Sequence, residues 1–247
     1  MSLLQVEQLR RSFGGVRAVD GVSFALVPGE VAALIGPNGA GKSTLFNLID
    51  GQLAPDQGRV LFDGASLTAW STADRTRRGI GRTFQVAQTF ATLTVLQNVQ
   101  LALVAAEGRA LNATHMFWHL REEAASLLLA QVGLQRNAAD PAASLAYGDV
   151  KRLELALALA ARPRLLLMDE PTAGMAAAER FELMRTIVGL AQASNTAVLF
   201  TEHSVDVVFG FARRVLVLSR GRLIADGTPE TVRVDAEVRR VYLGEEV

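Results

Sequence analysis

The nine residues from Gly36 to Thr44 carry the side chains and the spacing that phosphate binding needs. They read GPNGAGKST, match the pattern G-x-x-x-x-G-K-[ST] and directly follow the apolar run Val31–Ile35. Glycines let backbone N–H groups wrap a phosphate, and the helix expected next adds the positive end of its dipole. Lys42 brings positive charge to the β- and γ-phosphates, and Ser43 offers a hydroxyl to Mg²⁺. A nucleoside triphosphate is therefore predicted to bind Gly36, Pro37, Asn38, Gly39, Ala40, Gly41, Lys42, Ser43 and Thr44.

Two adjacent carboxylates form the second candidate for chemistry. Asp169 and Glu170 follow the apolar run Leu165–Met168, and open α/β sheets bind their ligands at the carboxyl ends of such strands. We expect Asp169 to hold Mg²⁺ through its water shell and Glu170 to orient and polarise the attacking water. Two acidic residues at a strand end can also be ordinary solvated side chains, but the phosphate-binding motif in the same chain favours the catalytic interpretation.

The elements that must position these residues follow from the apolar pattern. Strand-like runs are followed by helical patterns, which predicts an α/β fold with a parallel sheet, antiparallel ribbons near the N-terminus and a helical insertion. A hairpin is expected to turn at Arg220 and Gly221. The expected strands are 3–9, 22–26, 31–35, 58–64, 165–168 and 197–201, and the expected helical stretches are 95–161, interrupted at 137–140, and 176–194.

Composition narrows the class of protein. The 247 residues include 25 basic and 25 acidic ones, so no overall charge recruits nucleic acid or anionic lipid. There are no cysteines, which excludes disulfides and thiolate metal sites. The longest uncharged run, 83–106, contains amide side chains that are costly to bury in lipid, so no membrane span is expected. The first residues predict no signal sequence, which favours a cytoplasmic protein.

In the order of these motifs the chain resembles the ATP-binding subunits of ABC transporters over nearly its whole length. The resemblance implies a single ATPase domain over 1–247 with a P-loop NTPase core, an N-terminal antiparallel β subdomain, a helical subdomain at about 86–161 and a tail at about 228–247. It implies ATP and Mg²⁺ as cofactors.

The resemblance also assigns three single residues. Phe13 lies where an aromatic ring stacks on adenine, and Gln85 lies where a glutamine senses Mg²⁺ and water. His203 lies where a histidine contacts the γ-phosphate. A lone phenylalanine is otherwise usually a core residue. His115 and His119 have a spacing that suits a metal, but nothing nearby completes a site, and they are expected to be structural.

A variant sequence occupies the place of the family signature Leu-Ser-Gly-Gly-Gln, which faces the γ-phosphate bound by the opposite subunit. Ala146 lacks the serine hydroxyl, and losing one contact to a charged oxygen costs about 1.5–3 kcal/mol. Asp149 disfavours a nearby phosphate, and Lys151 and Arg152 are expected to offset that repulsion. We expect the two-subunit dimer to close, less tightly at this face; the alternative is a decayed signature. The signature residues are Leu145, Ala146, Tyr147, Gly148 and Asp149.

Several stretches, including GRTFQ at 81–85, LTVLQNV at 93–99 and the tail from Gly227, resemble the subunits that energise uptake of branched-chain and other hydrophobic amino acids. The resemblance implies a peripheral protein at the cytoplasmic face of the membrane, with permease subunits and, indirectly, a periplasmic solute-binding protein as partners. Ala176 stands where many members carry an aspartate that couples the two nucleotide sites, which favours a different second ATP-binding subunit over a homodimer.

Two alternatives stay open. An exporter or lipid-extraction ATPase shares all of these motifs, and a regulatory nucleotide-binding chain that hydrolyses poorly has to be weighed against the intact Glu170 and His203. A soluble ABC protein that acts on DNA or ribosomes is less expected, because it would usually carry tandem cassettes or coiled arms. The transported solute is not readable from this chain.

Overall fold

A six-stranded sheet forms the centre of the molecule. The structure is a computed structural model, and it describes residues 1–83, 89–107 and 121–243. Neighbouring strands of this sheet are parallel except for the last pair, in which β10 runs antiparallel to β9. In spatial order the strands are β10 (Arg222–Gly227), β9 (Arg214–Ser219), β3 (Val31–Ile35), β8 (Ala197–Thr201), β7 (Leu165–Asp169) and β6 (Ile80–Thr83).

The central strands are apolar along their whole length because both faces of the sheet are covered. Every residue of β3, β7 and β8 is buried. On β3, Val31, Ala33 and Ile35 join the core on the side of the helices, whereas Ala32 and Leu34 join the core on the side of the second sheet. The predicted strands 31–35 and 197–201 are confirmed, and the predicted strand 165–168 extends by one residue to Asp169.

A four-stranded antiparallel sheet covers one side of this core, in the order β2-β1-β4-β5. It contains β1 (Leu4–Phe13), β2 (Val16–Leu26), β4 (Gln57–Phe62) and β5 (Ala65–Ser66). The predicted strands 3–9 and 22–26 were too short, because the β1–β2 hairpin continues to Phe13 and Val16. Its outer half is exposed at the tip, partly buried elsewhere and rich in arginine, so no apolar alternation marks it as strand.

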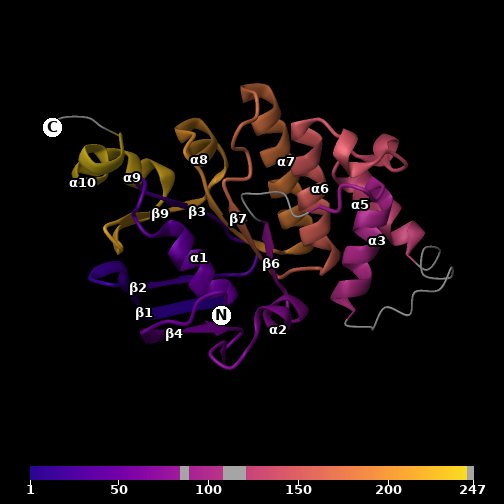
Figure 1. Cartoon of the computed structure of the whole chain (residues 1–247). Coiled ribbons are helices and arrows are strands. Elements are labelled where there is room, and N and C mark those ends of the chain that lie inside the picture. Colours follow the sequence, from indigo (N-terminus) through magenta and orange to yellow (C-terminus); the bar gives the residue numbers. More distant parts are fainter. Residues whose placement is uncertain (84–88, 108–120, 244–247) are drawn as a thin grey trace.

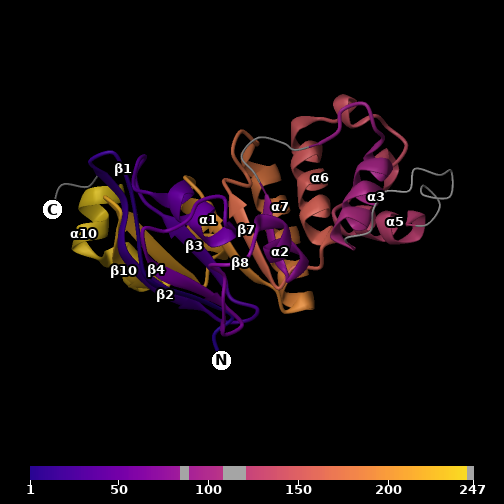
Figure 2. The ribbon, with the colours of Figure 1, turned by 60° about the horizontal axis from the view of Figure 1, so that its bottom comes forward.

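The helices lie on both sides of the central sheet and beyond its β6 edge (Figures 1 and 2). The helix α2 was not predicted from the sequence; a capping box at Ser71 and Asp74 marks its start. The helices are α1 (Lys42–Asp50), α2 (Thr72–Arg77), α3 (Val95–Ala106), α5 (Glu122–Gln131), α6 (Tyr147–Ala160), α7 (Ala177–Ser194), α8 (Val205–Phe211), α9 (Pro229–Val234) and α10 (Ala236–Val238), with short 3₁₀ turns at Gln135–Asn137 and Ala142–Ser144 and a π-helical turn at Arg239–Leu243.

The helices α3, α5 and α6 pack together at the end of the molecule beyond β6 (Figure 2). They fall in the range where the sequence predicts a helical subdomain, 86–161. Residues 84–88 and 108–120 lie outside the described part of the chain, so the limits of that subdomain stay a prediction. None of the helices in the described ranges has the length and apolarity that a membrane crossing requires.

The predicted hairpin at the C-terminal side is confirmed, with β9 and β10 joined at Arg220 and Gly221. Its turn packs against β2, where the Asp20 N–H donates to the Gly221 carbonyl at 2.8 Å. The Gly221 N–H donates in turn to the Ala40 carbonyl at 2.9 Å. The hairpin thereby holds the phosphate-binding motif against the four-stranded sheet.

Candidate functional site

The motif 36–44 forms the connection between β3 and α1, and two glycines decide its path. Gly36 has a φ of 152° and Gly41 a φ of 107°, both outside the range that L-residues normally adopt. A Cβ on Gly36 would collide with the Leu218 carbonyl, and one on Gly41 would collide with the Ala18 carbonyl. Only glycine therefore lets this loop lie against β9 and β2.

Helix α1 begins with amide groups that suit an anion. Gly41 is its N-cap residue and supplies no side-chain cap. The first helical hydrogen bond runs from the Leu45 N–H to the Gly41 carbonyl at 2.9 Å, so the N–H groups of Lys42, Ser43 and Thr44 have no partner inside the helix. These amides and the positive end of the helix dipole can bind a phosphate.

Lys42 is buried, and its ammonium lies inside the same loop. Its Nζ donates to the Gly36 carbonyl at 2.7 Å and to the Pro37 carbonyl at 3.1 Å. Burial lowers the pKa of Lys42, and the negative charges of Glu170 and Asp169 oppose that shift. The structure thus brings the lysine and the two carboxylates of the sequence prediction into one electrostatic cluster.

Thr201, the last residue of β8, fixes both carboxylate-bearing residues. Its hydroxyl donates to Asp169 Oδ1 at 2.7 Å and accepts the Glu170 N–H at 3.0 Å. Glu170 has a φ of 49°, a backbone conformation that costs a non-glycine residue free energy. The parallel register pairs Asp169 with Thr201. This partner was missed from the sequence, since only the strand pairing reveals which residue faces Asp169.

Glu170 and His203 form a direct pair. Glu170 Oε1 lies 2.9 Å from His203 Nε2, and His203 is about half exposed, whereas Glu170 is mostly buried. The two residues follow the ends of adjacent strands, β7 and β8. The carboxylate and the imidazole can therefore act on one substrate at the carboxyl edge of the sheet.

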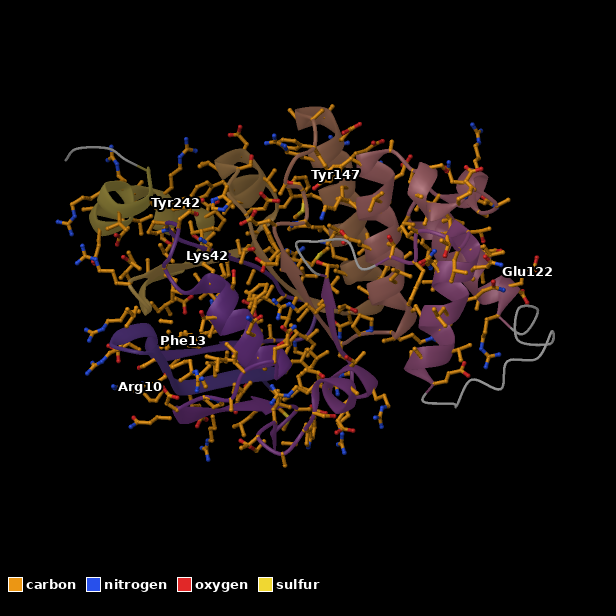
Figure 3. The ribbon with its side chains drawn as sticks, viewed as in Figure 1. Arg10, Phe13, Lys42, Glu122, Tyr147 and Tyr242 are labelled. Carbon is orange, nitrogen blue, oxygen red and sulfur yellow. The ribbon has the colours of Figure 1, made fainter. Side chains whose placement is uncertain are left out.

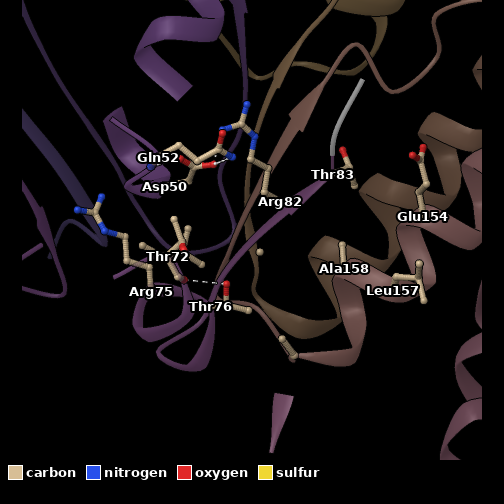
Figure 4. Close-up of a pocket in the computed structure, with 13 residues that line it drawn as sticks. Asp50, Gln52, Thr72, Arg75, Thr76, Arg82, Thr83, Glu154, Leu157 and Ala158 are labelled. Carbon is tan, nitrogen blue, oxygen red and sulfur yellow. Dashed lines mark hydrogen bonds and ion pairs between the residues drawn. The ribbon is translucent and has the colours of Figure 1, made fainter. Parts of the chain in front are cut away.

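An arginine with a mostly buried side chain lies next to Asp169. Arg82 on β6 pairs with Asp50, the last residue of α1, and its Nη2 lies 3.8 Å from Asp169 Oδ2. Figure 4 shows Arg82 directed at Asp50 on one side of a pocket and Glu154 of α6 on the other. The pocket has a volume of about 290 Å³. Sequence reasoning missed the Arg82–Asp50 pair because the two residues are far apart in sequence, and neither the stretch GRTFQ nor the helix that ends at Asp50 indicates the partner of the other.

Phe13 lies at the tip of the β1–β2 hairpin and is 45% exposed. Its only aromatic or cation–π contact within the described residues is with Arg11, whose guanidinium carbon lies 5.0 Å from the ring centroid. Figure 3 shows Phe13 and Lys42 on the same lobe of the molecule. The exposure excludes a core role for this ring and leaves its face available to a flat ligand.

The oxygen donors near the loop fit Mg²⁺. The described residues contain no group of three or more His, Cys, Asp and Glu side chains that would cage a metal. Mg²⁺ is ordinarily held by one or two protein oxygens together with phosphate oxygens and waters, and the Ser43 hydroxyl and the Asp169 carboxylate are oxygen donors of the kind that the sequence predicts for it. The third predicted ligand, Gln85, lies outside the described residues, as do His115 and His119.

The variant signature begins helix α6, with Ala146 as an N-cap that provides no side-chain cap. Tyr147 is exposed, and its ring lies against Gly174 of the loop that leads to Ala176. The Gly174 conformation, with a φ of 79°, and the close tyrosine ring both require glycine there. The signature and the loop that carries Ala176 are therefore packed as one surface.

The two cations expected to offset the charge of Asp149 lie in different surroundings. Arg152 Nε lies 3.9 Å from Asp149 Oδ1, and its Nη2 donates to Glu182 at 2.9 Å, so the offset by Arg152 stays a prediction. The expectation for Lys151 is wrong: Lys151 is buried and its Nζ donates to Glu154 at 3.0 Å. Helical geometry turns position 151 toward the interior, where burial raises the pKa of Glu154 and the bond to Lys151 opposes that shift.

Two protein-family descriptions match this chain. The description "ABC transporter" matches residues 19–173, which span the phosphate-binding loop, the signature and both carboxylates. The description "Branched-chain amino acid ATP-binding cassette transporter" matches residues 222–247, which begin with β10 and contain the C-terminal helices.

Individual relatives agree with the family match. The high-affinity branched-chain amino acid transport ATP-binding protein LivG of Escherichia coli K12 is 38% identical over 98% of each chain. The lipopolysaccharide export system ATP-binding protein LptB of Escherichia coli K12 is 35% identical over 100% of this chain and 99% of its own. The crystal structure of a nucleotide-free ATP-binding cassette from an ABC transporter superposes with a TM-score of 0.85 at 32% identity, covering 99% of this chain and 100% of the other. The chain therefore belongs to the ATP-binding subunits of ABC transporters, the nucleotide-hydrolysing components of that family.

Proposed function

We propose that this chain is the ATP-hydrolysing subunit of an importer for branched-chain or other hydrophobic amino acids. The observation that carries this proposal is the match of residues 222–247 to a C-terminal region described for branched-chain amino acid transporters. The similarity to LivG over 98% of the chain supports it. The protein then works at the cytoplasmic face of the membrane, bound to permease subunits. A periplasmic solute-binding protein delivers the solute to those subunits.

The geometry of Lys42, Glu170 and His203 supports their roles in ATP hydrolysis, and the roles of Phe13, Ser43 and Gln85 rest on the sequence motifs. The loop 36–44 holds the phosphates, with Lys42 as the positive charge, and Phe13 stacks on the adenine. Glu170 orients the attacking water, and His203, at 2.9 Å from Glu170, contacts the γ-phosphate. Ser43, Asp169 and Gln85 hold Mg²⁺, which offsets phosphate charge when it is bound. The ends of β7 and β8 bring the two catalytic side chains to one place.

The second ATP-binding subunit is a different chain. The signature surface of this chain, with Ala146 and Asp149, faces the nucleotide of that partner, while the partner's signature completes the site built on Lys42 and Glu170. Without a serine hydroxyl at 146 and with a carboxylate at 149, closure on the partner's nucleotide is weaker than closure on this chain's own.

A second function, ATP-driven export of a lipid, is favoured by one observation, the 35% identity to LptB over the whole chain. The motifs of the nucleotide site do not separate import from export, since they act on ATP and not on the solute. The membrane partner decides between them.

The first prediction tests the direction and class of transport. This chain is expressed with an affinity tag in its native host and purified from membranes together with its permease subunits. The complex is then reconstituted into lipid vesicles. With its solute-binding protein supplied, the vesicles should take up radiolabelled leucine only when ATP is present on the side of this chain, and the Lys42→Ala complex should not. Complexes that extract lipid and take up no leucine or other hydrophobic amino acid would establish the export function instead.

The second prediction separates chemistry from binding. Glu170→Gln should retain ATP affinity but slow hydrolysis by about 10²-fold or more, because an amide cannot accept a proton from water. Lys42→Ala should instead weaken ATP binding itself, since it removes the buried charge within the loop. Equilibrium ATP binding and steady-state hydrolysis of the assembled complex measure the two effects. Glu170→Gln turnover near that of the unmodified complex would remove Glu170 from the catalytic role.

The third prediction concerns the signature face. Changing Ala146→Ser together with Asp149→Gln on this chain should tighten closure at the partner's nucleotide and leave this chain's ATP affinity unchanged, because the two residues complete the opposite site. Site-resolved trapping of nucleotide in the mixed complex distinguishes the two sites. The change Thr186→Val on α7 is the control and should alter neither site. Increased trapping at this chain's own loop would contradict the asymmetric arrangement.

A further inference from the structure

The C-terminal end of the described chain reaches the strand end that carries His203. Tyr242, in the π-helical turn after α10, is half-buried and packs against the helical-side core. Its Oη–H donates to the Glu202 carbonyl across 3.4 Å. Burial raises the pKa of Tyr242, and the negative charge of Glu202 adds to that shift, so the phenol stays protonated and able to donate at neutral pH.

Glu202 is a buried carboxylate that fastens two loops together. Its Oε1 accepts the Thr172 N–H at 2.9 Å and the Thr172 hydroxyl at 2.5 Å. Its Oε2 accepts the His203 N–H at 3.1 Å. The Glu202 side chain thereby connects the loop after β7, which carries Glu170, to the backbone of His203. The Glu202 carbonyl accepts the hydrogen bond from the Tyr242 hydroxyl.

These contacts form one continuous path from the tail to the candidate catalytic pair. Tyr242 contacts Glu202, Glu202 is bonded covalently and through its side chain to His203, and His203 lies 2.9 Å from Glu170. Because Glu202 and His203 share a peptide bond, rotation of the Glu202 backbone moves the imidazole directly. A donor fixed on the Glu202 carbonyl restrains that rotation.

The tail is well anchored and can act as such a restraint. Val232 and Val238 are buried in the helical-side core. Asp235 caps α10 by accepting the N–H groups of Glu237 and Val238, each at 2.9 Å. The turn that presents Tyr242 therefore follows two packed and capped helices.

We propose that Tyr242 is a positioning residue that holds His203 in line with Glu170, so that the C-terminal tail sets the rate of hydrolysis from outside the nucleotide site. The inference rests on the role of His203 in the proposed function and adds a residue to it. Tyr242 contacts the backbone before His203 and acts on the reaction through that histidine.

The test compares Tyr242→Phe, His203→Ala and the double variant in the full chain assembled with its membrane subunits. The phenylalanine keeps the packed ring and removes only the hydroxyl. Loss of one neutral hydrogen bond should lower kcat about threefold to tenfold, while KM for ATP changes less than twofold. In the His203→Ala background, single-turnover rates with enzyme in excess should show no further loss from Tyr242→Phe.

The matched control is Thr186→Val, which removes an exposed hydroxyl that donates to the Glu182 carbonyl at 3.0 Å on α7. Its kcat should equal that of the unmodified complex. A Tyr242→Phe complex with unchanged kcat, or with a loss that adds fully to that of His203→Ala, overturns the inference while the His203 assignment stands. An active His203→Ala complex overturns the assignment itself and the inference with it.

Discussion

The arrangement of the site depends on one side chain, the Thr201 hydroxyl, which bonds to both residues of the carboxylate pair. It donates to the Asp169 carboxylate and accepts the Glu170 N–H. The last residue of β8 therefore fixes the positions of the two acidic residues at the end of β7. Glu170 leaves the strand with a positive φ, an unfavourable conformation for this residue type. Its N–H bond to Thr201 stabilises that turn and points the side chain at His203.

The remaining architecture brings the phosphate loop to this edge. The sheet is packed on both faces, so the ends of β3, β7 and β8 are held in register by their apolar side chains. The loop after β3 lies so close to Ala18 and Leu218 that only glycine fits at 36 and 41. Lys42 is consequently held in the loop near Asp169 and Glu170, whose charges counter the effect of burial on its pKa.

The most successful sequence predictions were those for positions where the residue type alone determines the local structure. Gly36, Gly41 and the fully apolar runs at 31–35 and 197–201 specify their own geometry, and the fold class followed from them. The outer half of the β1–β2 hairpin did not, because its arginines interrupt the apolar alternation that would indicate a strand. The sequence did not reveal three further residues, Thr201, Arg82 and Glu202. Each of them contacts a residue of the site that is at least 30 positions away in sequence, and a sequence pattern does not show such a contact. Lys151 was expected at the signature surface because only its charge was considered. The orientation of α6 instead directs its side chain into the interior, where it pairs with Glu154.

The most direct test of this account is the hydrolysis rate of the Thr201→Val complex, measured beside Thr196→Val. Both changes replace a buried threonine with a side chain of similar shape, and Thr196, just before β8, donates its hydroxyl to the Pro163 carbonyl at 2.8 Å. Each should destabilise the chain by about 1–3 kcal/mol. Only Thr201→Val should lower kcat, by about tenfold or more, with ATP affinity retained, because it frees both carboxylate-bearing residues. Equal kcat values for the two variants would contradict the claim that Thr201 positions Asp169 and Glu170 for hydrolysis.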